Sequence, residues 1–170
     1  ALQSTDFPAD FMLVAALNPC RCGYRTDPRR VCRCTPPQIE RYMAKVSGPL
    51  LDRIDIHIEV PAVKYEALSS ASEGTTSQSM RELVERARRV RRERFDGLST
   101  RFNAQMTSRQ TREFCRLDKE GCQQVRRSLE QLGFSARAYD KILRLARTIA
   151  DVEEQPKVLP AHVSEAINYR

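Results

Sequence analysis

The stretch Phe11-Met-Leu-Val-Ala-Ala-Leu-Asn18-Pro19 is an uninterrupted apolar run that ends at a polar side chain and a proline. Such runs are typical of strands buried on both faces, as in a parallel sheet. Pro19 ends the run because proline biases the preceding residue and cannot donate to a sheet. We therefore expect a β-strand at 11–17, with Asn18 at its carboxyl end.

A second strand is expected at 54–60, where isoleucine and valine alternate with Asp, His and Glu. Between the two strands, apolar residues at helical spacing predict a helix over 36–46 that begins at a proline. The polar stretch 68–79 has the composition of a linker. This organisation predicts an α/β part with two strands and one helix before the linker.

After the linker, the pattern predicts helices only. Apolar residues recur at helical spacing over 79–95, 108–116, 118–132, 135–150 and 160–169. Ser79 and Ser135 fit N-caps, Gly133 fits a C-terminal cap, and Pro160 fits a helix start. The fold class expected is therefore α+β, with an α/β portion followed by a helical bundle.

Four cysteines lie within fifteen residues, as two C-x-C pairs: Cys20, Cys22, Cys32 and Cys34. Four thiolates can close a tetrahedral structural zinc site, and a segment this polar has little apolar material to fold around. We therefore expect a zinc knob at 19–35; free or partly oxidised thiols are the alternative. Cys115 and Cys122 stand alone and are expected to be small buried hydrophobes. His57 and His162 are expected to be structural.

The 170-residue composition, with 41% hydrophobic and 30% charged residues, excludes a disordered or fibrous protein. No apolar run is long enough to span a bilayer, so no membrane partner is expected, and no targeting pattern is visible. Because no secretory signal is visible, a reducing cytoplasm is the expected location, and clustered thiols there favour metal over disulfides. The net charge of +7 suits a polyanionic partner such as nucleotide or nucleic acid.

These segments resemble a known family. The run 11–20, Arg41-Tyr42, and Ser47-Gly-Pro-Leu-Leu-Asp-Arg-Ile-Asp55 are similar to magnesium-chelatase-like AAA+ ATPases of bacteria, the competence-related proteins, some of which are regarded as branch-migration helicases. Ser135-Ala-Arg-Ala and Ala146-Arg-Thr-Ile-Ala-Asp151 resemble the helical lid of the same family. The resemblance implies three parts: the end of an AAA+ core with a zinc insert (1–67), a linker (68–79) and a lid (80–170).

The resemblance also implies roles for three polar residues. Asn18 corresponds to sensor 1, which holds the attacking water near the γ-phosphate of ATP. Arg53 corresponds to the arginine finger, which reaches the ATP of a neighbouring subunit in a homo-oligomeric ring. Arg137 corresponds to sensor 2, which contacts the γ-phosphate in its own subunit. Arginine suits both positions because its planar fork matches phosphate oxygens.

The chain contains no G-x-x-x-x-G-K-[ST] phosphate loop and no apolar strand that ends in Asp-Glu. We therefore expect a C-terminal fragment of an ATP-dependent motor that uses ATP and Mg²⁺ and acts on DNA, with no catalysis by the fragment alone. Two alternatives remain: a zinc-stabilised nucleic-acid-binding module without ATPase activity, or a subunit of a true magnesium chelatase.

Two basic segments could contact DNA phosphates. The first is the helix at 79–95, with arginines 86, 88, 89, 91, 92 and 94, although such a helix is more typical of a solvated face with ion pairs. The second is the arginine-rich cysteine knob.

Overall fold

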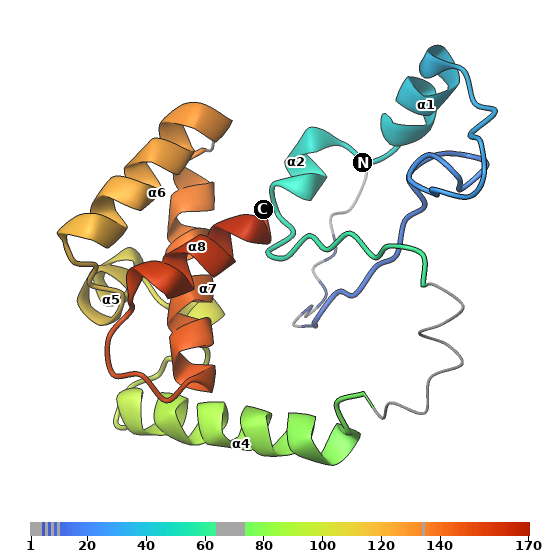
Figure 1. The fold of residues 1–170 in the computed structure, drawn as a ribbon. Helices are drawn as coiled ribbons and strands as arrows, with labels where there is room; N and C mark the ends of the chain where they lie inside the picture. Colours follow the sequence, from blue (N-terminus) through green and yellow to red (C-terminus); the bar gives the residue numbers. More distant parts are fainter. Residues whose placement is uncertain (1–4, 6, 8, 10, 64–73, 134) are drawn as a thin grey trace. The chain divides into compact units, whose positions relative to one another are not determined.

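The computed structural model describes residues 5, 7, 9, 11–63, 74–133 and 135–170. The chain divides into two compact units, Ala1–Val46 and Ser47–Arg170. The first contains one described helix, α1 (Pro36–Met43), which follows the cysteine knob (Figure 1). Thr35 caps this helix, and its backbone N–H donates to the Gln38 side chain at 3.0 Å. Two prolines start the helix, as the sequence predicts.

Every regular element among the described residues of the second unit is a helix. Its elements are α2 (Gly48–Leu51), α4 (Ser77–Arg94), the short 3₁₀ helix η1 (Asn103–Gln105), α5 (Ser108–Phe114), α6 (Lys119–Leu132), α7 (Ala136–Val152) and α8 (Pro160–Asn168). Helix α7 packs against α4, α5, η1 and α8, and α6 packs against α8 (Figure 1). Within this unit the sequence predicts helices alone for residues 80–170, and every regular element described there is a helix.

Two strands were expected at 11–17 and 54–60, and this prediction is wrong for the structure described. No strand forms in the described ranges. Both segments run without regular pairing. The second makes one long-range backbone hydrogen bond, from the His57 N–H to the Tyr169 carbonyl oxygen (2.8 Å). A strand buried on both faces needs strands beside it and layers over it, and no described backbone offers either segment such a neighbour.

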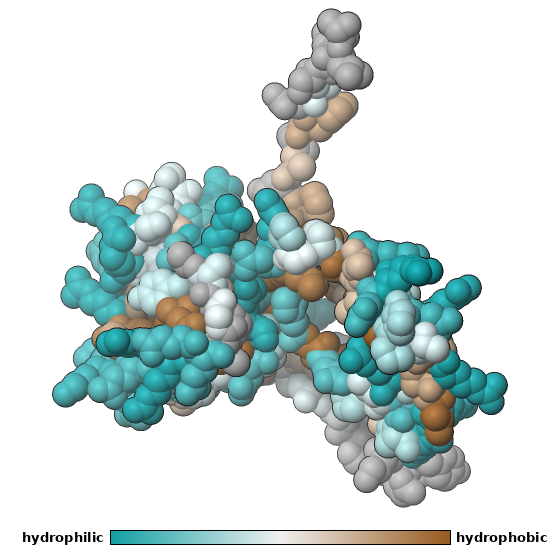
Figure 2. Space-filling model, turned by 90° about the horizontal axis from the view of Figure 1, so that it is seen from above, coloured by the Kyte–Doolittle hydropathy of each residue, from teal (hydrophilic) through white to brown (hydrophobic). Residues whose placement is uncertain are grey.

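The apolar side chains of these segments remain exposed as a result. Met12 is 88% exposed and Val60 is 82% exposed, although both were expected inside a sheet. Apolar side chains are open to view among hydrophilic ones in Figure 2. No described helix has the length and apolar character that crossing a bilayer requires.

The core of the second unit is formed by apolar faces of the helices. One cluster centres on Val125, Ile142 and Val163, from α6, α7 and α8. A second gathers Phe95, Met106, Cys115 and Leu143. Cys115 is buried as expected, whereas Cys122 is exposed and does not fit the prediction, because it lies on the open face of α6.

A buried ionic network ties α4 to α7. The Asp151 carboxylate accepts from the guanidinium groups of Arg94 and Arg147 and from the Asn103 amide at 2.9 Å. Arg147 also donates to the carbonyl oxygens of Gln155 (2.5 Å) and Pro156 (3.1 Å). The network satisfies charges that would otherwise be costly to bury.

Candidate metal centre and nucleotide-sensing residues

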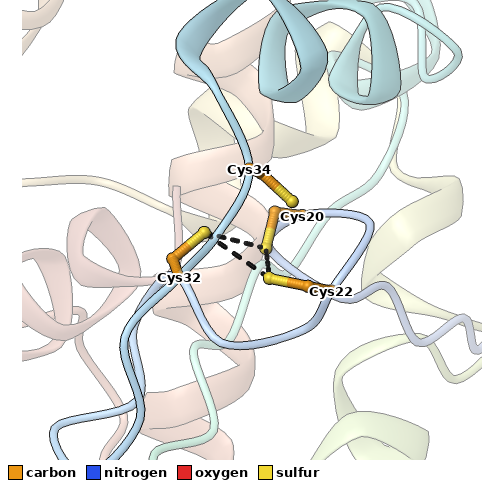
Figure 3. A group of neighbouring side chains, drawn as sticks. All are labelled: Cys20, Cys22, Cys32 and Cys34. Carbon is orange, nitrogen blue, oxygen red and sulfur yellow. Dashed lines mark hydrogen bonds between the residues drawn. The ribbon is translucent and has the colours of Figure 1, made fainter.

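The four clustered cysteines converge in space. Their sulfur atoms all lie within 4.8 Å of one another (Figure 3). The Sγ–Sγ distances are 3.3 Å for Cys20–Cys22, 3.5 Å for Cys22–Cys32 and 3.7 Å for Cys20–Cys32. None of the four is in a disulfide. The spacing that predicted a metal knob therefore brings the expected four donors together.

The donor set fits zinc. A tetrahedron with Zn–S bonds of about 2.3 Å has sulfur–sulfur edges of about 3.8 Å, close to the distances found here. Cys20 is the only buried residue among the described residues of Ala1–Val46, so this unit has no apolar core of its own. A structural metal would supply folding free energy that apolar packing does not.

The thiols differ in acidity because of their hydrogen bonds. The backbone at Tyr24 and the Cys20 side chain lower the pKa of Cys22 to about 6. The backbone at Cys34 lowers the pKa of Cys32, but burial and the neighbouring thiols of Cys22 and Cys20 outweigh it and raise the value to about 11. Because neighbouring thiolates repel one another, the four thiols do not all ionise together unless a bound cation offsets their charge.

The loop that carries the cysteines is shaped by tight turns. Gly23 adopts a φ of +82° and donates to the Cys20 carbonyl oxygen at 3.0 Å, which closes a turn around the first pair. The Asp27 carboxylate accepts from the Arg29 N–H at 2.8 Å and holds the next turn. Arg30 stacks on the Tyr24 ring and donates to its hydroxyl oxygen at 2.8 Å.

Asn18, the predicted sensor 1 residue, lies in the first unit just before this loop. It is exposed and precedes Pro19 on an extended segment. Arg53 and Arg137 lie in the second unit. The structure thus describes Asn18 in a different unit from the two arginines.

Arg53, the predicted finger, lies just after α2. Its guanidinium is exposed and donates to the Pro49 carbonyl oxygen at 2.7 Å. Its own carbonyl oxygen accepts from Lys141 of α7 at 2.5 Å, and Lys141 also pairs with Asp55 at 3.0 Å. Lys141 therefore attaches the residues before and after Ile54, namely Arg53 and Asp55, to α7.

Asp52 supplies a second attachment for this segment. Its carboxylate accepts from the Ser135 hydroxyl at 3.4 Å and from Arg170 at 3.3 Å. Arg170 also donates to the Ile54 carbonyl oxygen at 2.7 Å. Ser135 is the N-cap of α7, and it accepts from the Ala138 N–H at 3.3 Å.

Arg137, the predicted sensor 2 residue, occupies the first turn of α7 and is exposed. A cation in the first turn is unfavourable next to the positive end of the helix dipole. A bound anion nearby would offset this unfavourable interaction. Because Ser135 and Lys141 both hold the segment around Arg53, the structure brings the two predicted arginines to the same end of α7. Sequence reasoning missed Asp52, Lys141 and Arg170, since their contacts span more than eighty residues of the chain.

Six of the seven arginines of α4 are engaged within the unit, and the exposed Arg81 is the exception among the contacts described. Arg86 and Arg89 pair with Glu154, and Arg88 and Arg92 pair with Glu85. Arg94 is held by Asp151, and Arg91 stacks on the Phe102 ring at 4.6 Å. Helix α4 thus has the ion-paired face that the sequence favours, and Arg94 is too buried to reach a phosphate.

The two histidines have packing contacts. The buried His162 accepts from the Leu159 N–H through Nδ1 at 3.0 Å and meets Glu153 through Nε2 at 2.9 Å. His57 takes part through its backbone N–H. The contacts of His162 agree with its expected structural role. The buried Nε2 of His57 has no hydrogen-bond partner among the described residues, so the structural role of His57 stays a prediction.

Residues 74–170 match the family described as magnesium chelatase, subunit ChlI C-terminal, and residues 1–68 match magnesium chelatase, subunit ChlI. The chain belongs to the magnesium chelatase ChlI family. This confirms the resemblance carried by the Ser-Gly-Pro-Leu-Leu-Asp-Arg segment and by the lid motifs.

Similar proteins include the competence protein ComM of Haemophilus influenzae, which is 38% identical over 165 residues. An uncharacterized protein of Escherichia coli, YifB, is 35% identical over 167 residues, and one of Mycobacterium tuberculosis is 33% identical over 164 residues. Each alignment covers 96% of this chain but only 31% or 32% of the relative. The chain therefore spans about a third of the length of the curated relatives it matches.

Proposed function

We propose that this chain provides the sensing and coupling part of an ATP-dependent AAA+ ring motor that acts on DNA. In this proposal Asn18 acts as sensor 1, Arg53 acts as the arginine finger and Arg137 acts as sensor 2. The chain without a phosphate loop hydrolyses no ATP by itself. Membership of the ChlI family and the likeness to a competence protein support this assignment.

The observation that carries the proposal is the attachment of the Arg53 segment to α7. Lys141 lies one turn after Arg137 and contacts the Arg53 carbonyl oxygen. A movement of α7 that follows nucleotide at Arg137 would therefore also move Arg53. An arginine finger stabilises charge on the transferred phosphoryl group only when it is correctly placed, so this attachment can link two neighbouring ATP sites.

The zinc knob has a structural role in this proposal. Cys20, Cys22, Cys32 and Cys34 would hold one Zn²⁺, which stabilises the loop between Asn18 and α1. The ATP site would use Mg²⁺ held by residues of the phosphate-loop region.

A subunit-mixing experiment tests the two arginines, using this chain joined to the phosphate-loop region of the motor. Subunits with Arg53→Ala are mixed with subunits that lack the phosphate-loop lysine, and ATP turnover is measured. Turnover should partly return, because some interfaces regain a complete site; a finger supplies on the order of 10³-fold in rate. Nucleotide affinity should stay nearly unchanged.

The same mixture with Arg137→Ala should stay inactive, because a residue that acts in its own subunit cannot be replaced by its neighbour. Lys45→Ala, an exposed residue of the first unit, is the control and should leave turnover unchanged. Rescue by Arg137→Ala subunits but not by Arg53→Ala subunits would reverse the assignment. Wild-type turnover in both single variants would remove both arginines from the site.

A tetrapyrrole magnesium chelatase is the second candidate, favoured by the matching family description. Magnesium insertion into a porphyrin, assayed with the same joined protein, separates the two functions. DNA-stimulated ATP turnover is expected only for the motor.

A further inference from the structure

We propose that the cysteine knob, and not the basic helix α4, is the surface through which this chain contacts the backbone phosphates of DNA. This inference names the part of the chain that would bind the DNA partner in the proposed function. It rests on the arginines of the knob and on their surroundings.

Five arginines lie within the loop from Cys20 to Thr35, and all five are exposed: Arg21, Arg25, Arg29, Arg30 and Arg33. The same loop holds a single acidic residue, Asp27, whose carboxylate is used to close a turn. Among the ion pairs of the described residues, none involves a knob arginine. The positive charge of the knob therefore remains available to a partner.

The placement of two of these arginines follows from the cysteine pairs. Arg21 stands between Cys20 and Cys22, and Arg33 stands between Cys32 and Cys34. The four sulfurs converge on one point (Figure 3), and the arginine between the cysteines of each pair is exposed. Each C-x-C pair thus presents one guanidinium to solvent from a short, tightly turned loop.

Helix α4 offers a poorer surface for phosphates. Four of its arginines are shared between two glutamates, Glu85 and Glu154, and Arg94 is buried against Asp151. A phosphate would have to displace these carboxylates. Guanidinium groups without a carboxylate partner are preferred for phosphate contacts, which need no base recognition.

Direct binding of the purified chain to a labelled 30-base-pair duplex, without nucleotide, tests the proposal. The knob variant carries Arg21→Gln, Arg25→Gln, Arg29→Gln and Arg33→Gln, and keeps Arg30 on Tyr24. We expect its Kd to rise more than about tenfold, and the slope of log K against log salt to fall by about one for each arginine removed.

The matched control removes the same charge from α4, as Arg86→Gln, Arg88→Gln, Arg89→Gln and Arg92→Gln. It should bind within about twofold of the unmodified chain at the same salt concentration. Equal weakening in both variants would overturn the proposal, because net charge alone would then explain binding. Absence of any DNA binding by the unmodified chain would also overturn it.

A different explanation is that the knob arginines only offset the negative charge of a zinc–thiolate cluster. Zinc content distinguishes the two explanations, because the glutamine variant should keep its bound zinc while its affinity for DNA falls. A second variant with lysine at the same four positions keeps the charge and should bind DNA within about fivefold of the unmodified chain. If the lysine variant binds as weakly as the glutamine variant, the proposal fails.

Single-stranded DNA and polyglutamate serve as competitors. Both DNA forms should compete, since they share the phosphodiester backbone, whereas polyglutamate of equal charge should not. Effective competition by polyglutamate would instead assign the knob to an acidic protein. Because this assay uses no ATP, its outcome is independent of the subunit-mixing test of Arg53 and Arg137.

Discussion

At the residue scale, Cys20 is central to the first unit. It is the only buried residue in the described part of that unit, and it lies at the contact of the two C-x-C pairs. A unit that buries one small side chain cannot be stable through apolar packing, because burial contributes only about 25 cal/mol per Å² of apolar surface. We therefore infer that the thiols stabilise this unit by binding a metal ion.

The first prediction follows from that cluster. Cys32→Ser should reduce bound zinc from about one per chain to a small fraction, because three thiolates leave the tetrahedral site open. Elemental analysis measures the metal, and proteolysis within 19–35 reports the loss of local structure. Cys122→Ser, at an exposed cysteine of α6, is the control and should keep the metal. Stoichiometric zinc in the Cys32→Ser chain would contradict the assignment.

At the element scale, the helices could be predicted from sequence because their signals are local. Gly133 ends α6 with a φ of +64°, Ser135 caps α7 and Pro160 starts α8, all as expected. Helix α4 begins two residues earlier than predicted, because Thr76 caps it by accepting from the Ser79 N–H at 3.1 Å. Ser79, the predicted cap, therefore lies inside the first turn of α4.

The strands could not be predicted in the same way. An apolar run at 11–17 has the composition of a strand, but a strand exists only through partners that are distant in sequence. The candidate site likewise contains a part that follows from local sequence and a part that depends on distant contacts. The cysteine cluster follows from short spacing, whereas the contacts of Lys141 and Asp52 depend on how the helices pack.

A glycine substitution tests the end of α6. Gly133→Ala should lower the free energy of unfolding by about 1 kcal/mol, because alanine is strained at positive φ. No atom lies within 4 Å of an added Cβ, so backbone strain is the only source of this loss. Gly48→Ala meets equally open space without a positive φ and should show no loss in a urea titration. Equal changes in both variants would refute the argument.

At the scale of the whole molecule, the Asp151 network joins α4 and η1 to α7 within the second unit. Asp151→Ala leaves Arg94 and Arg147 without their carboxylate, and Arg147 is only 1% exposed. Removal of one partner from a buried ion pair costs about 3–5 kcal/mol. Urea unfolding of the chain should show a loss of this size.

The matched control for this prediction is Glu130→Ala. Glu130 pairs with Arg126 on the exposed surface of α6, where both side chains are more than half exposed. Such a pair contributes about 0.5 kcal/mol or less. If the two variants lose similar stability, the network around Asp151 is not what holds α4 to α7.

The enclosure of Arg147 also provides a natural spectroscopic probe. Its Nε–H donates to Asp151 at 3.0 Å inside the bundle, away from water. Exposed guanidinium protons exchange rapidly with solvent at neutral pH, whereas one enclosed in this way is protected. A nitrogen–proton correlation spectrum of the isotope-enriched chain should therefore contain a sharp side-chain resonance from Arg147. The resonance would report, in a titration with nucleotide or DNA, when α7 and the loop after it separate.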